Sequence, residues 1–433
     1  MEESALDSDG GHQPSSSHER RGVTLSREGR LLFAGRALRT FCLGWLSLVL
    51  ALHLAARGLS PAAIGAVFTA TLVEDALLTI VLSAFAVRLG RRRILIGAAL
   101  AMAAGGLLLA MAEGHAFVIV AVILATVSLG GQEAGPFSPL EQSLLPATVA
   151  TSERTRAFAW YNVCGFVPAG VGALAAGGWL ATATRLGLSP ETTDLGVMGV
   201  YVAGALALAV LYTRLPPSLD VAAAAPSAAR AARPWLGLHR SRGAVLQLSG
   251  LQALDSFGGG FVVQSLLVYW FHLRFGASPE TLGPVFFGTN LLSAVSFPLA
   301  ARVAERIGLL NTMVFTHLPS NVLLLLVPLA PSLPAAAALL LARHLLAQMD
   351  VPTRQAYAMA LVAPDERAAA AGFTTSARAL AQALSPALTG FALARAATGL
   401  PFYLAGGLKI VYDLALYFRF RRLALPADEA AAP

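Results

Sequence analysis

Charged residues are scarce in this chain. They make up 13% of its 433 residues, while hydrophobic residues make up 56%. A soluble globular domain carries about 25% charged residues. The composition therefore predicts a protein that crosses a membrane many times, and it argues against a large soluble core.

Several other features are missing. Only two cysteines occur, Cys42 and Cys164, and both fall inside apolar stretches, so the sequence indicates neither a disulfide nor a metal site. It contains no G-x-x-x-x-G-K phosphate loop, no H-E-x-x-H zinc pair and no G-x-S-x-G elbow. We therefore expect no enzyme activity, no cofactor and no bound metal. The polar first 30 residues hold no apolar run with a cleavage site, so we expect a disordered tail and no signal peptide.

The chain contains an internal repeat. A motif of the form S-P-x-x-[IL]-G-x-V-F begins at Ser60 and returns at Ser278. Two more motifs, A-x-R-[LI]-G and P-x-[ER]-Q-x10-E-R, begin at residues 86 and 139 and return at residues 304 and 352. Three motifs in the same order, at nearly constant spacing, indicate a duplicated half of roughly 200 residues.

Twelve stretches are apolar enough to cross a membrane, which takes about 20 residues each. Because six lie in each half, the sequence predicts an all-α polytopic membrane protein made of two six-helix repeats with pseudo-two-fold symmetry. The predicted spans are 36–56, 61–86, 93–113, 116–147, 155–182, 194–214, 244–272, 279–303, 309–330, 334–362, 368–397 and 401–420. The predicted domains are a tail at 1–30, an N-terminal bundle at 31–214, a cytoplasmic linker at 215–243, a C-terminal bundle at 244–420 and a tail at 421–433.

The basic residues predict the orientation of these spans. Of 31 Lys and Arg residues, 22 lie on one side of the predicted membrane, and four, Arg57, Arg185, Arg274 and Arg395, lie on the other. The positive-inside rule then places both termini and the linker in the cytoplasm. Because the arginines lie in short clusters between apolar stretches, the net charge of +7 does not indicate a nucleic-acid partner.

This pattern resembles the major facilitator superfamily of secondary transporters over about residues 36–420. The family signature G-x-x-x-D-R-x-G-R-R is matched after the second span, except that Ser83 and Val87 replace its Gly and Asp. In the family this acid helps to lock the cytoplasmic gate, and the second half keeps an acid at the equivalent place. The gate and loop motif consists of Arg88, Gly90, Arg91 and Arg92 in the first half and Glu305, Arg306 and Gly308 in the second.

A second resemblance is to the glycine-proline motif in the fifth span of the antiporter branch. The residues concerned are Gly165, Pro168, Gly170 and Gly172. Val167 interrupts the adjacent Gly-Pro pair, and Leu129 stands where proton antiporters carry the Arg of an R-x-x-Q-G motif. We interpret the glycines first as sites of close helix packing, which is compatible with a rocking motion.

Ionisable residues inside the spans are functional candidates, because a charge in the bilayer is costly and is retained for a reason. In the family the first, fourth, seventh and tenth spans line the central cavity, and polar residues concentrate in three of these. Structural interpretations remain: Glu74 and Asp75 could pair with Arg39, and His344 could be a packing residue. The predicted substrate and proton pathway consists of Glu74, Asp75, Glu133, Glu141, Asp255, Gln264, Arg343, His344, Asp350 and Arg354.

Glu141 and Arg354 occupy the same place in the two repeats and carry opposite charges. The pseudo-two-fold axis relates the two positions across the central gap. We predict that they attract each other when the cytoplasmic side closes and separate when it opens. The alternative is that one of them binds substrate.

The sequence and the resemblance together predict proton-coupled efflux of a small cationic or lipophilic molecule by alternating access. A second hypothesis is proton-coupled transport of a polar metabolite or an organic anion, held by Arg343 and Arg354. A membrane sensor or lipid-modifying protein is the alternative from another class, and the missing motifs argue against it. The expected partners are membrane lipids, the small-molecule substrate and protons, and the expected state is a monomer in the inner (cytoplasmic) membrane.

Overall fold

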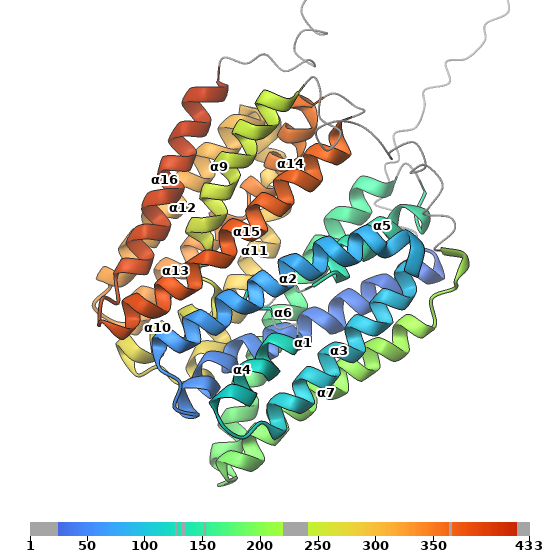
Figure 1. Cartoon of the computed structure of the whole chain (residues 1–433). Helices are drawn as coiled ribbons and strands as arrows, with labels where there is room; N and C mark the ends of the chain where they lie inside the picture. The colour runs from blue at the N-terminus through green and yellow to red at the C-terminus, as the bar shows by residue number, and fades with distance from the viewer. Residues whose placement is uncertain are drawn as a thin grey trace, which may run out of the picture.

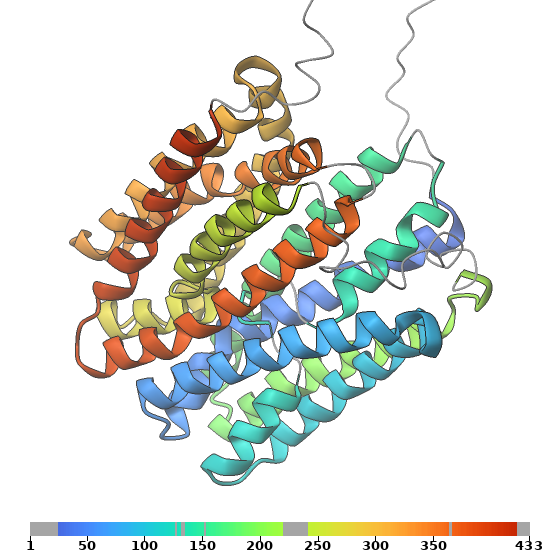
Figure 2. The same cartoon turned by 45° about the horizontal axis from the view of Figure 1, so that its top comes forward.

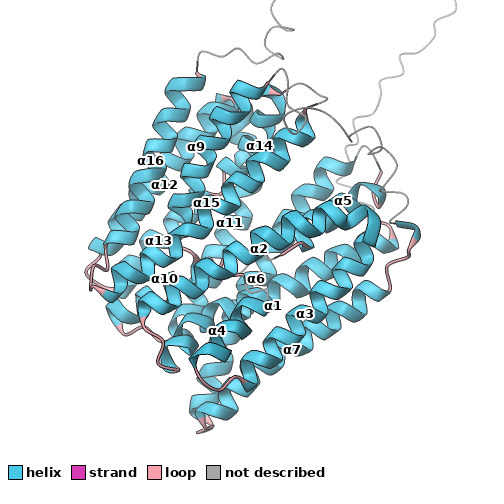
Figure 3. Cartoon of the chain, in the orientation of Figure 1, coloured by secondary structure: helices cyan, strands magenta, loops and turns pink. Residues whose placement is uncertain are grey.

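The structure is a computed structural model that describes residues 25–125, 128–130, 135–150, 153–219, 241–362 and 366–421. Helices are the only regular elements within these residues (Figure 3). The two halves form two helical groups that lie side by side (Figures 1 and 2). Most of the predicted tails and of the linker at 215–243 falls outside the described residues.

Six spans form the first half. Ser26, Ser60 and Ser189 each begin a helix by accepting a hydrogen bond from a backbone N–H three residues later, which satisfies a donor that the helix itself leaves free. The elements are α1 (Arg27–Ala56), α2 (Pro61–Leu89), α3 (Arg91–Met111), α4 (His115–Leu124), α5 (Phe137–Leu144), the short 3-10 helix η1 (Leu145–Ala147), α6 (Arg154–Arg185) and α7 (Pro190–Thr213).

Six more spans form the second half. Its elements are α9 (Arg242–Gly260), α10 (Gln264–Phe275), α11 (Pro279–Ile307), α12 (Leu309–Leu326), η4 (Val327–Leu329), α13 (Leu333–Ala347), α14 (Asp350–Leu361), α15 (Arg367–Ala394) and α16 (Leu400–Phe420). By length and composition alone, eight segments of the described chain are apolar enough to cross a membrane, and α4 is a shorter apolar helix. The elements of both halves overlap the twelve predicted stretches, with the largest difference at α1, which begins at Arg27 instead of residue 36.

Three predicted spans each consist of two helices with a break between them. The fourth consists of α4 and α5, the seventh of α9 and α10, and the tenth of α13 and α14. The fourth span is rich in glycine and proline, among them Gly130, Gly135 and Pro136, and this composition alone predicts an irregular helix there; no break is predicted for the seventh or the tenth span. The fourth and tenth spans are repeat partners, so both halves break the same helix. Interrupted backbone at membrane depth is tolerated where protein or a cavity surrounds it.

The break in the seventh span coincides with a short insertion relative to the first span. Gly44 and Gly260 are equivalent, because each faces a main-chain carbonyl in the fifth span of its own half. Gly58 and Gly276 are equivalent as well, because they end the first and seventh spans with positive φ. The stretch from Gly260 to Gly276 is, however, two positions longer than that from Gly44 to Gly58. Each added residue turns a helix by about 100°, so the insertion would rotate the rest of the span away from its packing. The chain instead ends α9 at Gly260 and begins α10 after the insertion.

The turn after the second span is the same in both halves. Gly90 and Gly308 have φ values of +85° and +83°, a region that residues with a Cβ rarely adopt. Each glycine ends one long helix, with its N–H bonded to the carbonyl four residues earlier, and begins the next helix. The glycine of the loop motif is therefore required by the turn itself.

The halves contact each other through their second and fifth spans. α2 packs against α15, and α11 packs against α6. Gly65 faces Gly390 in the first contact, and Gly283 faces Gly177 in the second. These pairs are equivalent under the repeat and lie toward the helix ends remote from the chain termini. Small residues allow such close approach of two backbones.

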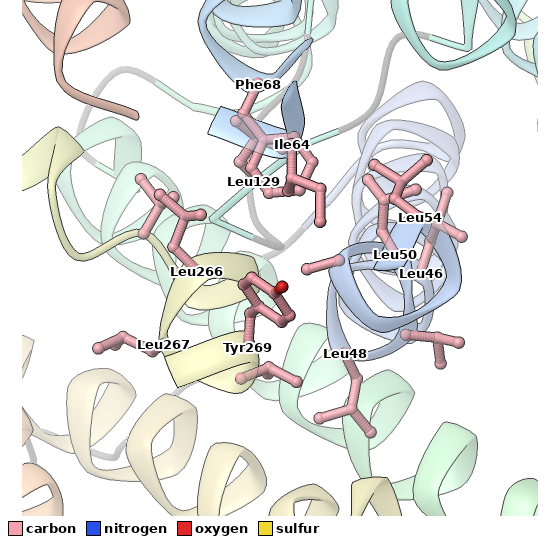
Figure 4. Close-up of a cluster of buried hydrophobic side chains, with 14 of the residues drawn as sticks. Leu46, Leu48, Leu50, Leu54, Ile64, Phe68, Leu129, Leu266, Leu267 and Tyr269 are labelled. Carbon is pink, nitrogen blue, oxygen red and sulfur yellow. The ribbon is translucent and has the colours of Figure 1, made fainter. Parts of the chain in front are cut away.

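A buried apolar cluster also joins the halves. It includes Leu50 of α1, Ile64 of α2, and Leu266 and Tyr269 of α10. Figure 4 shows the α10 side chains opposite those of α1 and α2. Because α10 belongs to the second half, this cluster packs the two halves against each other next to the break in the seventh span.

Candidate functional site

A cavity of about 240 Å³ lies within the second half. Every span of that half contributes to its lining, whereas Gly130 is the lining residue from the first half. Of the four spans expected to line a central cavity, the seventh and tenth supply most of the lining of this one, and the fourth contributes Gly130. The volume is close to the lower end of ligand sites, about 300 Å³, and suits a small molecule. The ionisable lining residues are Asp255, His317, Arg343, His344, Asp350, Arg354, Arg378 and Lys409.

Asp255 on α9 is the centre of this cluster. Its Oδ1 lies 2.6 Å from Nζ of Lys409, and its Oδ2 lies 3.4 Å from a guanidinium nitrogen of Arg354. Gly258 and Gly259 lie against the side chain of Lys409, so the glycine run leaves room for the lysine to reach Asp255. Asp255 is buried, and a buried charge needs such partners.

A second carboxylate lies behind the first. Asp413 on α16 places Oδ1 2.8 Å from Nδ1 of His317 and accepts a 2.9 Å hydrogen bond at Oδ2 from Asn321. Nε2 of His317 lies 3.8 Å from Oδ1 of Asp255, so the imidazole stands between two carboxylates. All four side chains are buried.

No role is predicted from the sequence for His317, Asn321 or Asp413. One signal could have found them: His317 and Asn321 on α12, like Lys409 and Asp413 on α16, are four residues apart. Residues at this spacing share a face of a helix. Four polar residues on two such faces predict a buried polar contact between these two spans.

The tenth span supplies most of the remaining charges. Arg354 and Asp350 lie one turn apart on α14 and form a 2.6 Å ion pair. On α13, Nδ1 of His344 lies 2.7 Å from the carbonyl of Leu340, so Nδ1 is the donor and Nε2 remains an acceptor. Arg343 lines the cavity beside it. The break between α13 and α14 thus brings four predicted pathway residues to one cavity.

Two arginines of the cavity, Arg343 and Arg378, make no ion pair with any residue that the structure describes. Nε of Arg378 donates a 2.9 Å hydrogen bond to Ser256. Nε of Arg343 is buried and finds no hydrogen-bond partner in the described part of the chain. Uncompensated cations inside a membrane protein are costly and point to a missing partner of opposite charge.

Gln264 connects the two halves at the break in the seventh span. Its Nε2 donates a 2.7 Å hydrogen bond to Ser47 of α1, and its Oε1 accepts one of 3.3 Å from Asn290 of α11. Ser265 next to it donates to the carbonyl of Ser47 at 3.0 Å. Gln264 also lines the cavity, so this predicted pathway residue closes the cavity on the side of the first half.

Glu141 is paired differently from the predicted gate. It forms a 2.7 Å ion pair with Arg39, and the hydroxyls of Tyr161 and Tyr212 donate to its carboxylate. Arg39 and Glu141 are both fully buried. Since Arg354 is neutralised by the acids of its own half, a pair between Glu141 and Arg354 would have to break two existing clusters. In this structure each charge is paired within its own half, and the gate stays a prediction for a state with the cytoplasmic side closed.

The acids of the second span also lack the suggested partner Arg39, since Arg39 pairs with Glu141. Asp75 accepts a hydrogen bond from the backbone N–H of Gly135, beside the break of the fourth span. Oε2 of Glu74 is buried and has no hydrogen-bond partner among the residues that are described. Glu133 lies outside the described residues.

The predicted motifs occupy packing and surface positions. A Cβ on Gly172 would collide with the carbonyl of Phe41 on α1, and Gly165 makes room for the guanidinium of Arg36. Gly170 faces Asn290 of α11, and Pro168 lies inside α6. In the loop motif, Arg92 donates a 2.7 Å hydrogen bond to the carbonyl of Thr213. The exposed residues of that motif include Arg88, Glu305 and Arg306.

No group of three or more His, Cys, Asp or Glu side chains with metal-binding geometry occurs in the described ranges.

The chain matches the sequence profile described as Major Facilitator Superfamily over residues 32–342 and 250–433. The chain belongs to the Major Facilitator Superfamily. It is accordingly a transporter and not an enzyme, and the predicted all-α fold of six plus six spans is confirmed.

Relatives and solved structures resemble the chain over nearly its whole length. The membrane protein YJR124C of Saccharomyces cerevisiae is 24% identical over 424 residues, which cover 91% of this chain and 94% of the yeast protein. The human organic anion transporter MFSD10 (TETRAN) has a TM-score of 0.64 at 17% identity and covers 90% of this chain and 100% of its own. The nucleoside transporter NupG has a TM-score of 0.67 at 14% identity, and the match covers 92% of this chain and 100% of NupG. At such identities, the solved structures show a shared fold.

Proposed function

We propose that this member of the superfamily transports a small organic anion by alternating access and binds it in the cavity of the second half. The observation that carries the proposal is the charge balance of the lining. Four cationic side chains face the cavity with two carboxylates. If Asp413 behind His317 is counted as a third carboxylate and the histidines are neutral, the site still has a net charge of +1.

The four cations have different roles in this proposal. Lys409 and Arg354 are held by Asp255, whereas Arg343 and Arg378 have no acid in contact within the described chain. A guanidinium donates two parallel hydrogen bonds to a carboxylate, so these two arginines are suited to hold the anionic group of a substrate. The description of the human MFSD10 as an organic anion transporter supports the same substrate class.

Uptake into proteoliposomes tests this proposal. The probes are radiolabelled benzoate, succinate and citrate, which carry one, two and three carboxylates. We expect uptake of at least one probe, and Arg343→Gln or Arg378→Gln should weaken its binding by about tenfold or more, because each change removes a hydrogen bond to a charged group. The exposed Arg185→Gln is the matched control for loss of one positive charge. If folded wild-type protein takes up none of the three, the anion proposal is wrong.

The first sequence hypothesis, proton-coupled efflux of a cationic or lipophilic molecule, remains a second candidate. The specific observation in its favour is Glu74, a buried acid whose Oε2 has no partner among the described residues. In this case the protein should export tetraphenylphosphonium, and Glu74→Gln should abolish proton-driven export. We further propose that the protein is a monomer in the cytoplasmic membrane with both termini in the cytoplasm, as its arginines favour.

A further inference from the structure

His317 stands between two carboxylates that differ in their access to the cavity. Asp413, on the Nδ1 side, is fully buried, and Asp255, on the Nε2 side, lines the cavity. We infer that His317 is the site of the coupling proton and that this proton travels in the same direction as the substrate anion. This inference rests on the proposed function, because it assigns the coupling ion of the same cavity.

The hydrogen-bond partners assign the tautomer of the neutral ring: the amide of Asn321, 3.2 Å from Nδ1, donates to Asp413 and leaves Nδ1 to donate to the same carboxylate. Nδ1 lies 2.8 Å from Asp413, a hydrogen-bond distance, so Nδ1 carries the hydrogen and donates it. Nε2 then presents a lone pair to Oδ1 of Asp255, and the 3.8 Å between them exceeds a hydrogen bond. A proton taken up from water at Nε2 supplies the missing donor. Protonated His317 then donates to both carboxylates.

Charged groups surround this ring from every neighbouring span. From α9 comes Asp255, from α14 Arg354 and Asp350, and from α16 Lys409 and Asp413. Across the cavity lie Arg343 and His344 of α13 and Arg378 of α15. The two carboxylates are in closest contact with the ring, and the cations on the cavity side are the groups that an incoming anion would neutralise.

Proton and anion therefore favour each other in two ways. The added positive charge on His317 attracts an anion into the same small cavity. In addition, Oδ1 of Asp255 is shared between Lys409 and His317, so a hydrogen bond from protonated Nε2 competes with Lys409 for it. Lys409 is then released toward the anion. Coupling of this kind is reciprocal, so the anion must also strengthen proton binding.

The consequence is symport with a fixed charge balance. A monocarboxylate and one proton together carry no net charge. The first sequence hypothesis, by contrast, is proton-coupled efflux of a cationic or lipophilic molecule. His317 thus assigns the direction of proton movement as well as its site.

Titration calorimetry on the purified wild-type protein tests the inference, with benzoate as probe. Binding is measured in two buffers of different ionisation enthalpy, so that the difference in heat reports the protons taken up. In the pH range where the apparent Kd rises by about tenfold per pH unit, we expect about one proton to be taken up per benzoate, because both quantities report the same linkage. In His317→Gln the uptake should fall to near zero while benzoate still binds, and the dependence on pH should flatten.

Two further variants complete the experiment. Asp413→Asn keeps the ring but removes the carboxylate that orients Nδ1, and it should lower the uptake even if His317→Gln does not fold. His272→Gln, an exposed histidine at the end of α10, should leave uptake and binding unchanged. If the wild type binds benzoate without taking up a proton, or if His317→Gln keeps full uptake, the role of His317 is wrong while the anion proposal stands. If benzoate, succinate and citrate all fail to bind, the anion proposal itself fails and the coupling fails with it.

Discussion

Arg39 and Asp255 occupy equivalent places in the two halves and carry opposite charges. Their separation along the chain is the same as that of the packing glycines of the same spans, Gly44 and Gly260. Arg39 pairs at 2.7 Å with a glutamate of the fourth span, and Asp255 contacts an arginine of the tenth span at 3.4 Å. Because these two partners are equivalent as well, each half holds an ion pair between its first and fourth spans, with the polarity reversed.

The two pairs have different surroundings, and this difference supports the proposal that the site lies in the second half. In the first half, the hydroxyls of Tyr161 and Tyr212 saturate Glu141, and both charges are fully buried. In the second half, the pair opens onto a cavity with further cations. The repeat gives both halves the same framework, and the proposed substrate site lies in the half whose ion pair lines the cavity.

Arg39→Gln tests the structural role of the first pair. The change leaves the carboxylate of Glu141 buried without its cation, which costs about 3–5 kcal/mol. We expect a large loss of thermal stability and of folded protein in membranes, measured by fluorescence-detected size exclusion during heating. The double variant Arg39→Gln with Glu141→Gln should recover most of the stability, since it strands no charge. Equal stability of the single variant and wild type would contradict the assignment.

How much of this fold the sequence predicts depends on whether a feature is set by neighbouring residues or by contacts between distant spans. Span positions depend on runs of apolar residues, and the equivalence of Glu141 with Arg354 depends on the repeat, so both could be predicted. The partner of Glu141 could not, because Arg39, in a span far earlier in the chain, meets it only after the helices pack. The same holds for Asp413, whose partner His317 belongs to another span. Sequence reasoning located the charged positions but not their contacts.

Lys409 offers a direct probe of the cavity, because it is the only lysine in the chain. Its amine is bonded to Asp255 and faces the cavity, so a small acetylating reagent must enter the cavity to reach it. We expect slow acetylation in the wild type and several-fold faster acetylation in Asp255→Asn, in which the ion pair no longer holds the amine. Peptide mass spectrometry measures the modified fraction.

Benzoate provides the second arm of the labelling experiment. If the cavity binds the anion, benzoate should protect Lys409 in Asp255→Asn, whereas the neutral analogue benzamide should not. The same peptide in Lys409→Arg must remain unmodified, which confirms the site of reaction. Rapid labelling of the wild type, insensitive to Asp255, would show that the ion pair does not form in the membrane.

Reporter fusions test the orientation. Fusions after Arg242 and after Arg421 should both report the cytoplasm, because the basic residues cluster on that side. A fusion after Leu186, beyond the end of α6, should report the opposite side. A non-cytoplasmic signal after Arg242 or Arg421 would overturn the predicted topology.

Gly177 and Gly178 provide a matched pair for testing the rocking motion. A Cβ on Gly177 would lie 2.8 Å from the carbonyl of Pro279 and 3.3 Å from Cα of Gly283, both on α11 in the other half. A Cβ on Gly178, one residue later on α6, would meet nothing within 4 Å. Gly177→Leu should therefore wedge the halves apart at this end, while Gly178→Leu should have no effect.

The readout is placed at the other contact between the halves, so that a purely local distortion would not register. There the backbone N–H of Ala387 donates a 3.0 Å hydrogen bond to Thr69. Cysteines at positions 69 and 387, in a background of Cys42→Ala and Cys164→Ala, should form a disulfide readily in the parent and with Gly178→Leu. With Gly177→Leu the yield should fall several-fold, because a wedge at one contact displaces or tilts the whole opposite half and so changes the spacing of positions 69 and 387. An unchanged yield would mean that the halves bend around the wedge, and alternating access would then need internal helix movement, for which the breaks in the seventh and tenth spans are the places to look.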